Sequence, residues 1–309
     1  MLTVFRKELT DHFTSLRFII LLLLIFLIGV FAERAAAYGI RGEVSETSRF
    51  IFLRLFTSSG GMWPSFITFI ALLIPIVGIV LGFDAVNSER SNGTLSLVLS
   101  QPIYRDAFIN GKFLAGVVVM AIMLTSTMLV VSGMGLRIIG VPPNSEEVFR
   151  LFVFLLTSIV YGSLWLGIGI LFSILLRRTA TSVLASIAIW IFFSFFIALI
   201  ARWLGGLIVP LGQDPAAELV VQRVEIEGAI MRISPIVLFE EAMACLLIPS
   251  IRSLGPLLPT ETIRMLPNPL PMSQSLLLVW PQLTGLIAIT AVCFAISYLK
   301  FTRQEIRPT

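Results

Sequence analysis

Long uninterrupted runs of apolar residues dominate the chain. Five runs carry no charged residue: 62–83, 113–136, 151–176, 179–201 and 275–299. Because a bilayer core of about 30 Å is crossed by about 20 helical residues, each run predicts a membrane-spanning helix. A sixth run, 18–32, is shorter, but thirteen of its fifteen residues are Leu, Ile, Phe or Val, so insertion is favourable even with Arg17 beside it. We therefore expect six membrane-spanning helices.

The first run also has features of a cleaved signal peptide. A basic start that includes Arg17 precedes it, and three alanines follow at 35–37. The acidic Glu8 and Asp11, and the charged pair Glu33-Arg34 directly before the alanines, disfavour cleavage. Either interpretation places residue 40 on the outer side of the membrane, so the topology does not depend on the choice.

Composition agrees with this pattern and excludes other classes of protein. Hydrophobic residues make up 57% of the 309 residues and charged residues 13%, whereas soluble domains contain roughly 45–50% and about 25%. The net charge of +4 is scattered, so nucleic acid is not an expected partner; membrane lipids are. The two cysteines form no metal or redox motif, and the sole histidine, His12, has no companion ligand nearby.

Loop charges predict the orientation in the membrane. With an inner N-terminus, the inner segments are 1–17, 84–112, 177–178 and 300–309, and they carry eleven Lys or Arg against six Asp or Glu. The outer segments carry eleven against twelve over a greater length. Since positive residues concentrate in cytoplasmic loops, we expect both termini in the cytoplasm and a multi-pass protein of the cell membrane.

We expect residues 1–309 to form one transmembrane domain. Within it, 1–16 is predicted to be an amphipathic interfacial helix, because apolar residues recur every three or four positions from Leu2 to Leu16 with charges opposite. Residues 204–274 are predicted to be an outer loop with some helix, serving as a lid or a plain connector. Small-residue pairs in the fourth and fifth spans favour close helix packing, within the chain rather than between subunits: Ser158/Gly162, Ser163/Gly167, Gly169/Ser173 and Ser182/Ser186.

The inner loop 84–112 combines turn, helix and charge signals. Asn92-Gly93 indicates a turn, Thr94 can cap a following helix, and Leu95 and Leu99 would give that helix an apolar face. Pro102 marks a helix start before the third span. Four charged residues flank these positions, namely Asp84, Glu89, Arg90 and Arg105. Local physics is equally consistent with a surface for a cytosolic partner and with an ordinary solvated loop.

The spacing of these residues is similar to that of a known family. Gly82-Phe83-Asp84, Glu89-Arg90, Gly93-Thr94-Leu95, Leu99-Ser100, Pro102, Arg105 and Gly111-Lys112 resemble the signature of ABC-2 type transporter permeases, the six-helix membrane subunits of type-II ABC exporters. The segment Phe5–Leu9 resembles their connecting helix. Ser234-Pro235 and Leu238–Glu241 resemble the prokaryotic branch that includes the nitrous-oxide-reductase maturation permeases.

The resemblance implies a permease dimer driven by separate cytosolic ABC ATPase subunits. It implies that a coupling helix in 84–112 seats in a groove of the ATPase, with the contact carried by Asp84, Glu89, Arg90, Gly93, Thr94, Leu95, Leu99, Pro102 and Arg105. ATP and Mg are expected on the partner, because this chain has no Walker A motif: Asp106 stands where its first glycine belongs and Phe113 where its hydroxyl belongs. The resemblance does not distinguish a homodimer from a heterodimer and marks no substrate-lining residue.

Two other classes of function are consistent with a membrane protein of this kind. An intramembrane protease would need a second aspartate, a histidine base or a metal motif within the spans, and the sequence offers none. A secondary transporter or channel not coupled to ATP is the main alternative. It is disfavoured because the five longest predicted spans contain no ionisable residue for a driving ion. We therefore expect a transport subunit rather than an enzyme.

Overall fold

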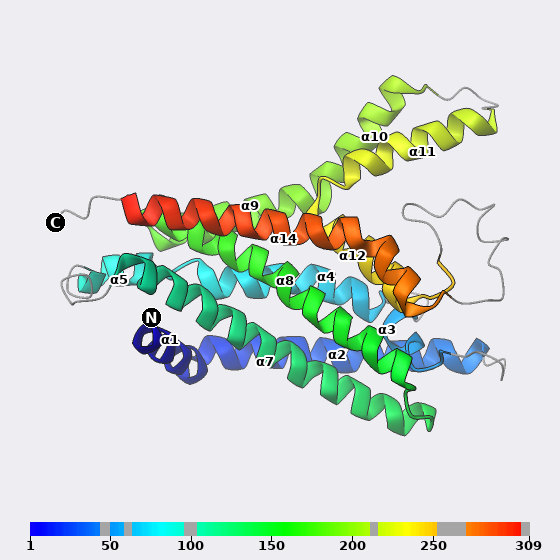
Figure 1. Cartoon of the computed structure of the whole chain (residues 1–309), viewed down its shortest axis with the longest axis horizontal. Coiled ribbons are helices and arrows are strands. Elements are labelled where there is room, and N and C mark those ends of the chain that lie inside the picture. Colours follow the sequence, from blue (N-terminus) through cyan, green and yellow to red (C-terminus); the bar gives the residue numbers. More distant parts are fainter. Residues whose placement is uncertain (44–49, 59–63, 96–103, 211–215, 252–269, 304–309) are drawn as a thin grey trace.

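A computed structural model describes residues 1–43, 50–58, 64–95, 104–210, 216–251 and 270–303 (Figure 1). In this part of the chain every regular element is helical. The elements are α1 (Leu2–Thr14), α2 (Leu16–Glu43), α3 (Arg54–Thr57), α4 (Phe66–Gly82), α5 (Asn87–Ser91), α7 (Arg105–Ile139), α8 (Ser145–Leu175), α9 (Thr179–Ile191), the π-helix η1 (Phe192–Phe196), α10 (Ile197–Ile208), α11 (Ala217–Met231), α12 (Pro235–Leu247) and α14 (Met272–Arg303).

The described part contains six helices long and apolar enough to cross a membrane, as the sequence predicts. They span Leu16–Arg34, Phe66–Ser91, Arg105–Ile139, Ser145–Leu175, Thr179–Ile208 and Met272–Arg303. Several of them extend well beyond the predicted apolar runs, α7 and α8 at their N-terminal ends. α7 therefore includes Lys112 and α8 includes Glu147 and Arg150, all three of them buried. The expectation that the long spans lack ionisable residues is thus correct for their central portions and wrong for their ends.

Helices α4 and α8 pack so closely that glycine is required between them. A Cβ atom on Gly78 would lie 2.7 Å from the carbonyl oxygen of Gly162, and one on Gly82 would lie 2.6 Å from that of Leu166. Gly169 faces α4 in the same way. Small residues allow helix backbones to approach in a membrane, where packing replaces the hydrophobic effect. The small residues Gly162 and Gly169 of the fourth span therefore serve packing within the chain, as expected.

The described residues of the segment 204–274, which the sequence predicts to be an outer loop with some helix, are largely helical and form two parts. α10 continues the fifth span beyond the π-turn η1, and α11 folds back along it, so that the pair projects from the bundle (Figure 1). The sequence of α11 alternates apolar and charged residues without a clear strand or helix period, yet the segment is a helix. α12 instead packs into the bundle against α4, α8 and α14, where Phe239 stacks on Tyr161 with ring centroids 4.5 Å apart.

A buried arginine holds α12 and α14 at the N-terminal end of α8. Arg150 donates hydrogen bonds to the carbonyl oxygens of Leu246 (2.6 Å) and Leu270 (2.7 Å), to Ser275 Oγ (3.2 Å) and to Glu146 (2.9 Å). Buried carbonyl groups need donors, and one guanidinium supplies several in a fixed geometry. Arg150 therefore holds the end of α12 and the residue Leu270, just before α14, against α8.

Candidate functional site

Hydrogen bonds to α8 and α9 fix the start of the inner loop. The Ser173 hydroxyl accepts hydrogen bonds from the backbone N–H groups of Val86 (2.9 Å) and Asn87 (3.1 Å). The Ser182 hydroxyl donates to the carbonyl oxygen of Phe83 (2.8 Å). These serines satisfy backbone groups that are left open where α4 ends and α5 begins. The turn between α4 and α5 is therefore part of the bundle rather than a free loop.

An ion pair joins the same turn to the start of the first span. Arg17, at the beginning of α2, pairs with Asp84 and lies over the ring of Phe83, with its guanidinium carbon 5.4 Å from the ring centroid. The sequence places Arg90 and Arg105 closest to Asp84 along the inner loop, but the structure pairs Asp84 with Arg17, which is 67 positions away. This contact connects the end of α4 to α2.

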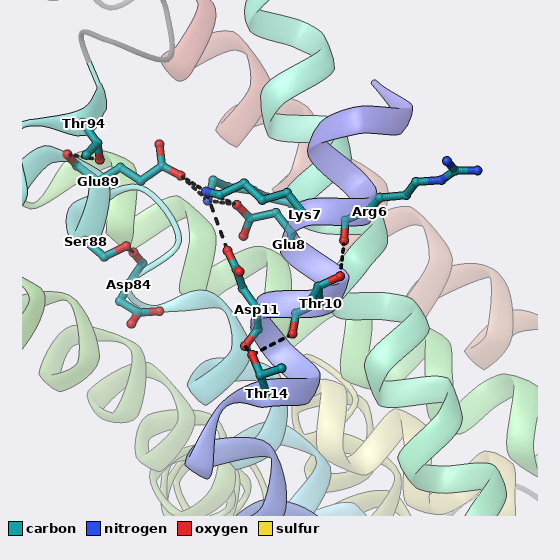
Figure 2. Close-up of polar contacts among 11 residues, drawn as sticks. Arg6, Lys7, Glu8, Thr10, Asp11, Thr14, Asp84, Ser88, Glu89 and Thr94 are labelled. Carbon is teal, nitrogen blue, oxygen red and sulfur yellow. Dashed lines mark hydrogen bonds and ion pairs between the residues drawn. The ribbon is translucent and has the colours of Figure 1, made fainter.

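A second, more buried ion cluster joins α1, α5 and α7 (Figure 2). Lys112 Nζ lies 2.7 Å from Glu8 Oε1 and 3.0 Å from Glu89 Oε1. All three side chains are largely buried, with exposures of 5% for Lys112, 12% for Glu8 and 10% for Glu89. Lys7, which is much more exposed, reaches Glu89 at 3.5 Å (Figure 2). Lys112 thus ties the N-terminal helix and α5 to the base of the third span.

These charged groups line a polar cleft of about 420 Å³ between α1 and the inner loop. Glu89 Oε2 is buried there without a hydrogen-bond partner among the described residues. His12 also lines the cleft. Burial lowers the pKa of His12, because desolvation penalises the charged imidazolium; Glu8 opposes this shift and Lys112 adds to it. Burial in the cleft therefore favours the neutral form of His12.

The predicted coupling residues take different places in this arrangement. Asp84 and Glu89 are paired within the chain, and Arg105 begins α7 and donates to the carbonyl oxygen of Thr302 (3.4 Å). Leu95 is buried and Arg90 is half-buried. Leu99 and Pro102 lie outside the described residues.

Asn92 and Gly93 form the predicted turn. Gly93 has φ = +70°, in the left-handed region that favours glycine, and a Cβ there would meet no atom within 4 Å. The Thr94 hydroxyl donates to the carbonyl oxygen of Glu89 (3.2 Å), which closes the turn on α5. Asn92, Gly93 and Thr94 are exposed, so this turn is the accessible tip of the described inner loop.

Sequence reasoning missed the partners that hold the loop in place: Arg17, Lys112, Ser173 and Ser182. The sequence singled out Ser173 and Ser182 only as small packing residues, and Lys112 only as part of the family signature. Nothing local links these positions, because Glu8 and Lys112 are 104 residues apart. Their pairing follows from the helix packing.

Comparison with known proteins identifies the family. Residues 2–306 match the model of the ABC-2 family transporter protein. The chain is 27% identical over 196 residues to the probable ABC transporter permease protein NosY of Pseudomonas aeruginosa, covering 62% of this chain and 66% of that protein. It is 25% identical over 194 residues to the NosY protein of Stutzerimonas stutzeri, covering 61% and 64%. The match thus spans just under two thirds of these relatives. The chain belongs to the ABC-2 transporter family and is a multi-pass membrane permease.

Proposed function

We propose that this chain is the membrane subunit of an ATP-driven exporter. In this proposal two permease copies form the transport path, and separate cytosolic ABC ATPase subunits bind ATP and Mg and supply the energy. Membership of the ABC-2 family supports the arrangement, as do the two relatives described as probable ABC transporter permeases. The observation that carries the proposal is an exposed turn mounted on an internally braced inner loop.

The proposed orientation places both termini in the cytoplasm of a cell-membrane protein. α1, α5 and the C-terminal end of α14 lie at the same end of the bundle (Figure 1). Basic residues gather at this end, including Arg17, Lys112, Lys300 and Arg303 together with the turn Arg177-Arg178. Such a concentration is typical of the cytoplasmic side. The inner loop would then face the ATPase.

The coupling assignment keeps the residues named from sequence and divides them by role. Gly93 and Thr94 would shape the exposed tip, Leu95, Leu99 and Pro102 would belong to the coupling segment, and Arg90 and Arg105 would add charge around it. Asp84 and Glu89 hold the loop against the helix bundle through their ion pairs with Arg17 and Lys112. These ion pairs are needed for coupling, because a flexible loop would absorb the motion of the ATPase instead of transmitting it to the membrane helices.

The braces define how motion would reach the membrane. Closure of the ATPase pair would push on the turn at Gly93 and move α5. The Glu89–Lys112 contact would carry this displacement to α7 and, through Glu8, to α1. The Asp84–Arg17 contact would carry it to α2. Tightly packed helices shift as units rather than deforming continuously, so the inner ends of α2, α4 and α7 would move together.

Two glycines offer a matched test of coupling. Gly93 and Gly140 both have left-handed φ values, +70° and +75°, and a Cβ on either meets no atom within 4 Å. Valine at either position therefore introduces the same backbone strain of about 1–3 kcal/mol, but only Gly93 lies at the inner end. We expect Gly93→Val to reduce permease-stimulated ATPase activity and transport at least about tenfold, and Gly140→Val to leave both near wild type. Equal losses in the two variants, or no loss in either, would contradict the coupling role.

One observation favours the alternative, a secondary transporter. Glu33 lies in α2, is fully buried, and neither carboxylate oxygen has a hydrogen-bond partner in the described structure. Intramembrane carboxylates often bind a driving ion. Purified permease in liposomes, tested with an ion gradient and no ATPase, decides between the two functions. Transport that is lost in Glu33→Gln would establish the secondary transporter. Our proposal requires that no transport occurs without the ATPase.

A further inference from the structure

A groove of about 490 Å³ opens between the inner ends of α8 and α14. Its lining combines two kinds of side chain. Four are aliphatic and two are cationic: Ile174, Leu175, Ile296, Leu299, Lys300 and Arg303. The groove is separate from the cleft of the inner loop, whose lining shares no residue with it.

The sequence of α14 explains why the two kinds of side chain meet on one face. Positions 296, 299, 300 and 303 are three or four residues apart, so they form a continuous helical stripe. The opposite face of α14 is occupied, because Ser297 and Phe301 are buried and Phe301 stacks on Phe108 of α7, with ring centroids 5.3 Å apart. The stripe is therefore turned away from α7.

The end of α8 provides the other wall. α8 stops at Leu175, and the extended backbone of Leu176 leads into the basic turn at 177–178. Ile174 and Leu175 thus lie opposite the stripe on α14. The chain leaves this wall at 177–178, near the end of the groove where Lys300 and Arg303 lie. The groove is consequently apolar along its length and positively charged at its mouth.

The positive charge at the mouth is not neutralised within the described structure. Lys300 and Arg303 are exposed and take part in none of the salt bridges among the described residues. α14 contains no Asp or Glu, and neither does the stretch 170–178. An occupant with an anionic head and an apolar tail would match both ends of the groove.

We propose that this groove binds an anionic phospholipid. One acyl chain lies along Ile174, Leu175, Ile296 and Leu299, and the phosphate accepts charge-assisted hydrogen bonds from Lys300 and Arg303. A zwitterionic lipid fits less well, because no carboxylate among the described residues lines the groove to receive its ammonium group. A free anion would leave the aliphatic walls unfilled. Basic pockets at the ends of membrane helices recognise anionic lipids on the same physical grounds.

The test uses the purified permease, stripped of lipid in detergent, with lipid binding followed by the rise in its thermal unfolding midpoint. The probes are dioleoyl phosphatidylglycerol, dioleoyl phosphatidylcholine and inorganic phosphate. We expect phosphatidylglycerol to bind about thirtyfold more tightly than phosphatidylcholine, since each cation near an anionic surface contributes about a fivefold gain. High salt should weaken this preference, and phosphate alone should not stabilise the protein.

The double variant Lys300→Ala/Arg303→Ala should remove the preference for phosphatidylglycerol while keeping the midpoint measured in phosphatidylcholine, because neither side chain braces the fold. The matched control is Arg137→Ala/Arg202→Ala, which removes two exposed cations elsewhere in the chain and should keep the preference. Equal affinity for the two lipids, a preference that survives in the Lys300/Arg303 variant, or stabilisation by phosphate equal to that by the lipid would overturn the proposal.

Discussion

The buried lysine at the base of α7 gives the most direct prediction about the braced inner loop. Lys112 Nζ contacts Glu8 Oε1 at 2.7 Å and Glu89 Oε1 at 3.0 Å, and its ammonium group lies 4.9 Å from the ring centroid of Phe108. Lys112→Met keeps most of the side-chain volume but removes the charge. It leaves two largely buried carboxylates facing one another with only the exposed Lys7 close to both in the described structure.

The size of the effect follows from burial. Removing one partner of a buried ion pair destabilises a protein by about 3–5 kcal/mol, because the remaining charge stays desolvated. We expect Lys112→Met to lower the free energy of unfolding by that amount. Lys7→Met removes the same charge from the same cluster, but the Lys7 side chain is 58% exposed, and exposed pairs contribute at most about 1 kcal/mol. The two variants should therefore differ clearly.

Thermal unfolding of the purified permease, followed by tryptophan fluorescence, measures the difference. The double variant Lys112→Met/Glu89→Gln serves as a second control. Its amide at position 89 removes one of the two buried carboxylate charges that the single variant leaves uncompensated, so it should restore part of the lost stability. If Lys112→Met unfolds no earlier than Lys7→Met, the ion cluster does not brace the loop and the reasoning fails.

Two further predictions concern helix packing and pH. Gly82→Ala places a Cβ 2.6 Å from the Leu166 carbonyl oxygen and should destabilise the permease by about 1–3 kcal/mol, seen as a lower unfolding midpoint; an unchanged midpoint would show that α4 and α8 can separate freely. Because burial lowers the pKa of His12 in the folded state, the unfolded state binds more protons near its ordinary value of about 6.5. The free energy of unfolding should thus fall as pH drops through and below about 6.5, and its dependence on pH should be weaker in His12→Gln. An equal dependence on pH in the wild type and in His12→Gln would show that His12 is not its source.

The number of spans could be predicted from sequence, but hydropathy alone did not show how far the helices extend beyond their apolar runs. The apolar run 113–136 reveals the third span, whereas α7 begins at Arg105. The additional helix carries Lys112, which is stable in a buried position because Glu8 and Glu89 come from α1 and α5 to meet it. Hydropathy treats an isolated lysine as unfavourable in the membrane. The compensating partners become visible only when the helices are packed.

The turn of the candidate site could be predicted from the sequence, but the contacts that its residues make could not. The turn at Gly93 could be predicted, because a left-handed residue after Asn92 is a local property of the chain. The partner of Asp84 could not, because Arg17 is close to it only after α2 and α4 have come together. The roles of the coupling residues toward an ATPase remain predictions.

Photo-crosslinking from the exposed tip of the inner loop tests the central claim most directly. A benzophenone amino acid is placed at Asn92, next to the turn, and in a second permease at Arg137, near the opposite end of α7. Each is expressed with the ATPase subunit of its transporter and irradiated in cells. We predict an adduct between the permease and the ATPase from position 92 and none from position 137. No adduct from position 92, or equal adducts from both positions, would contradict the account.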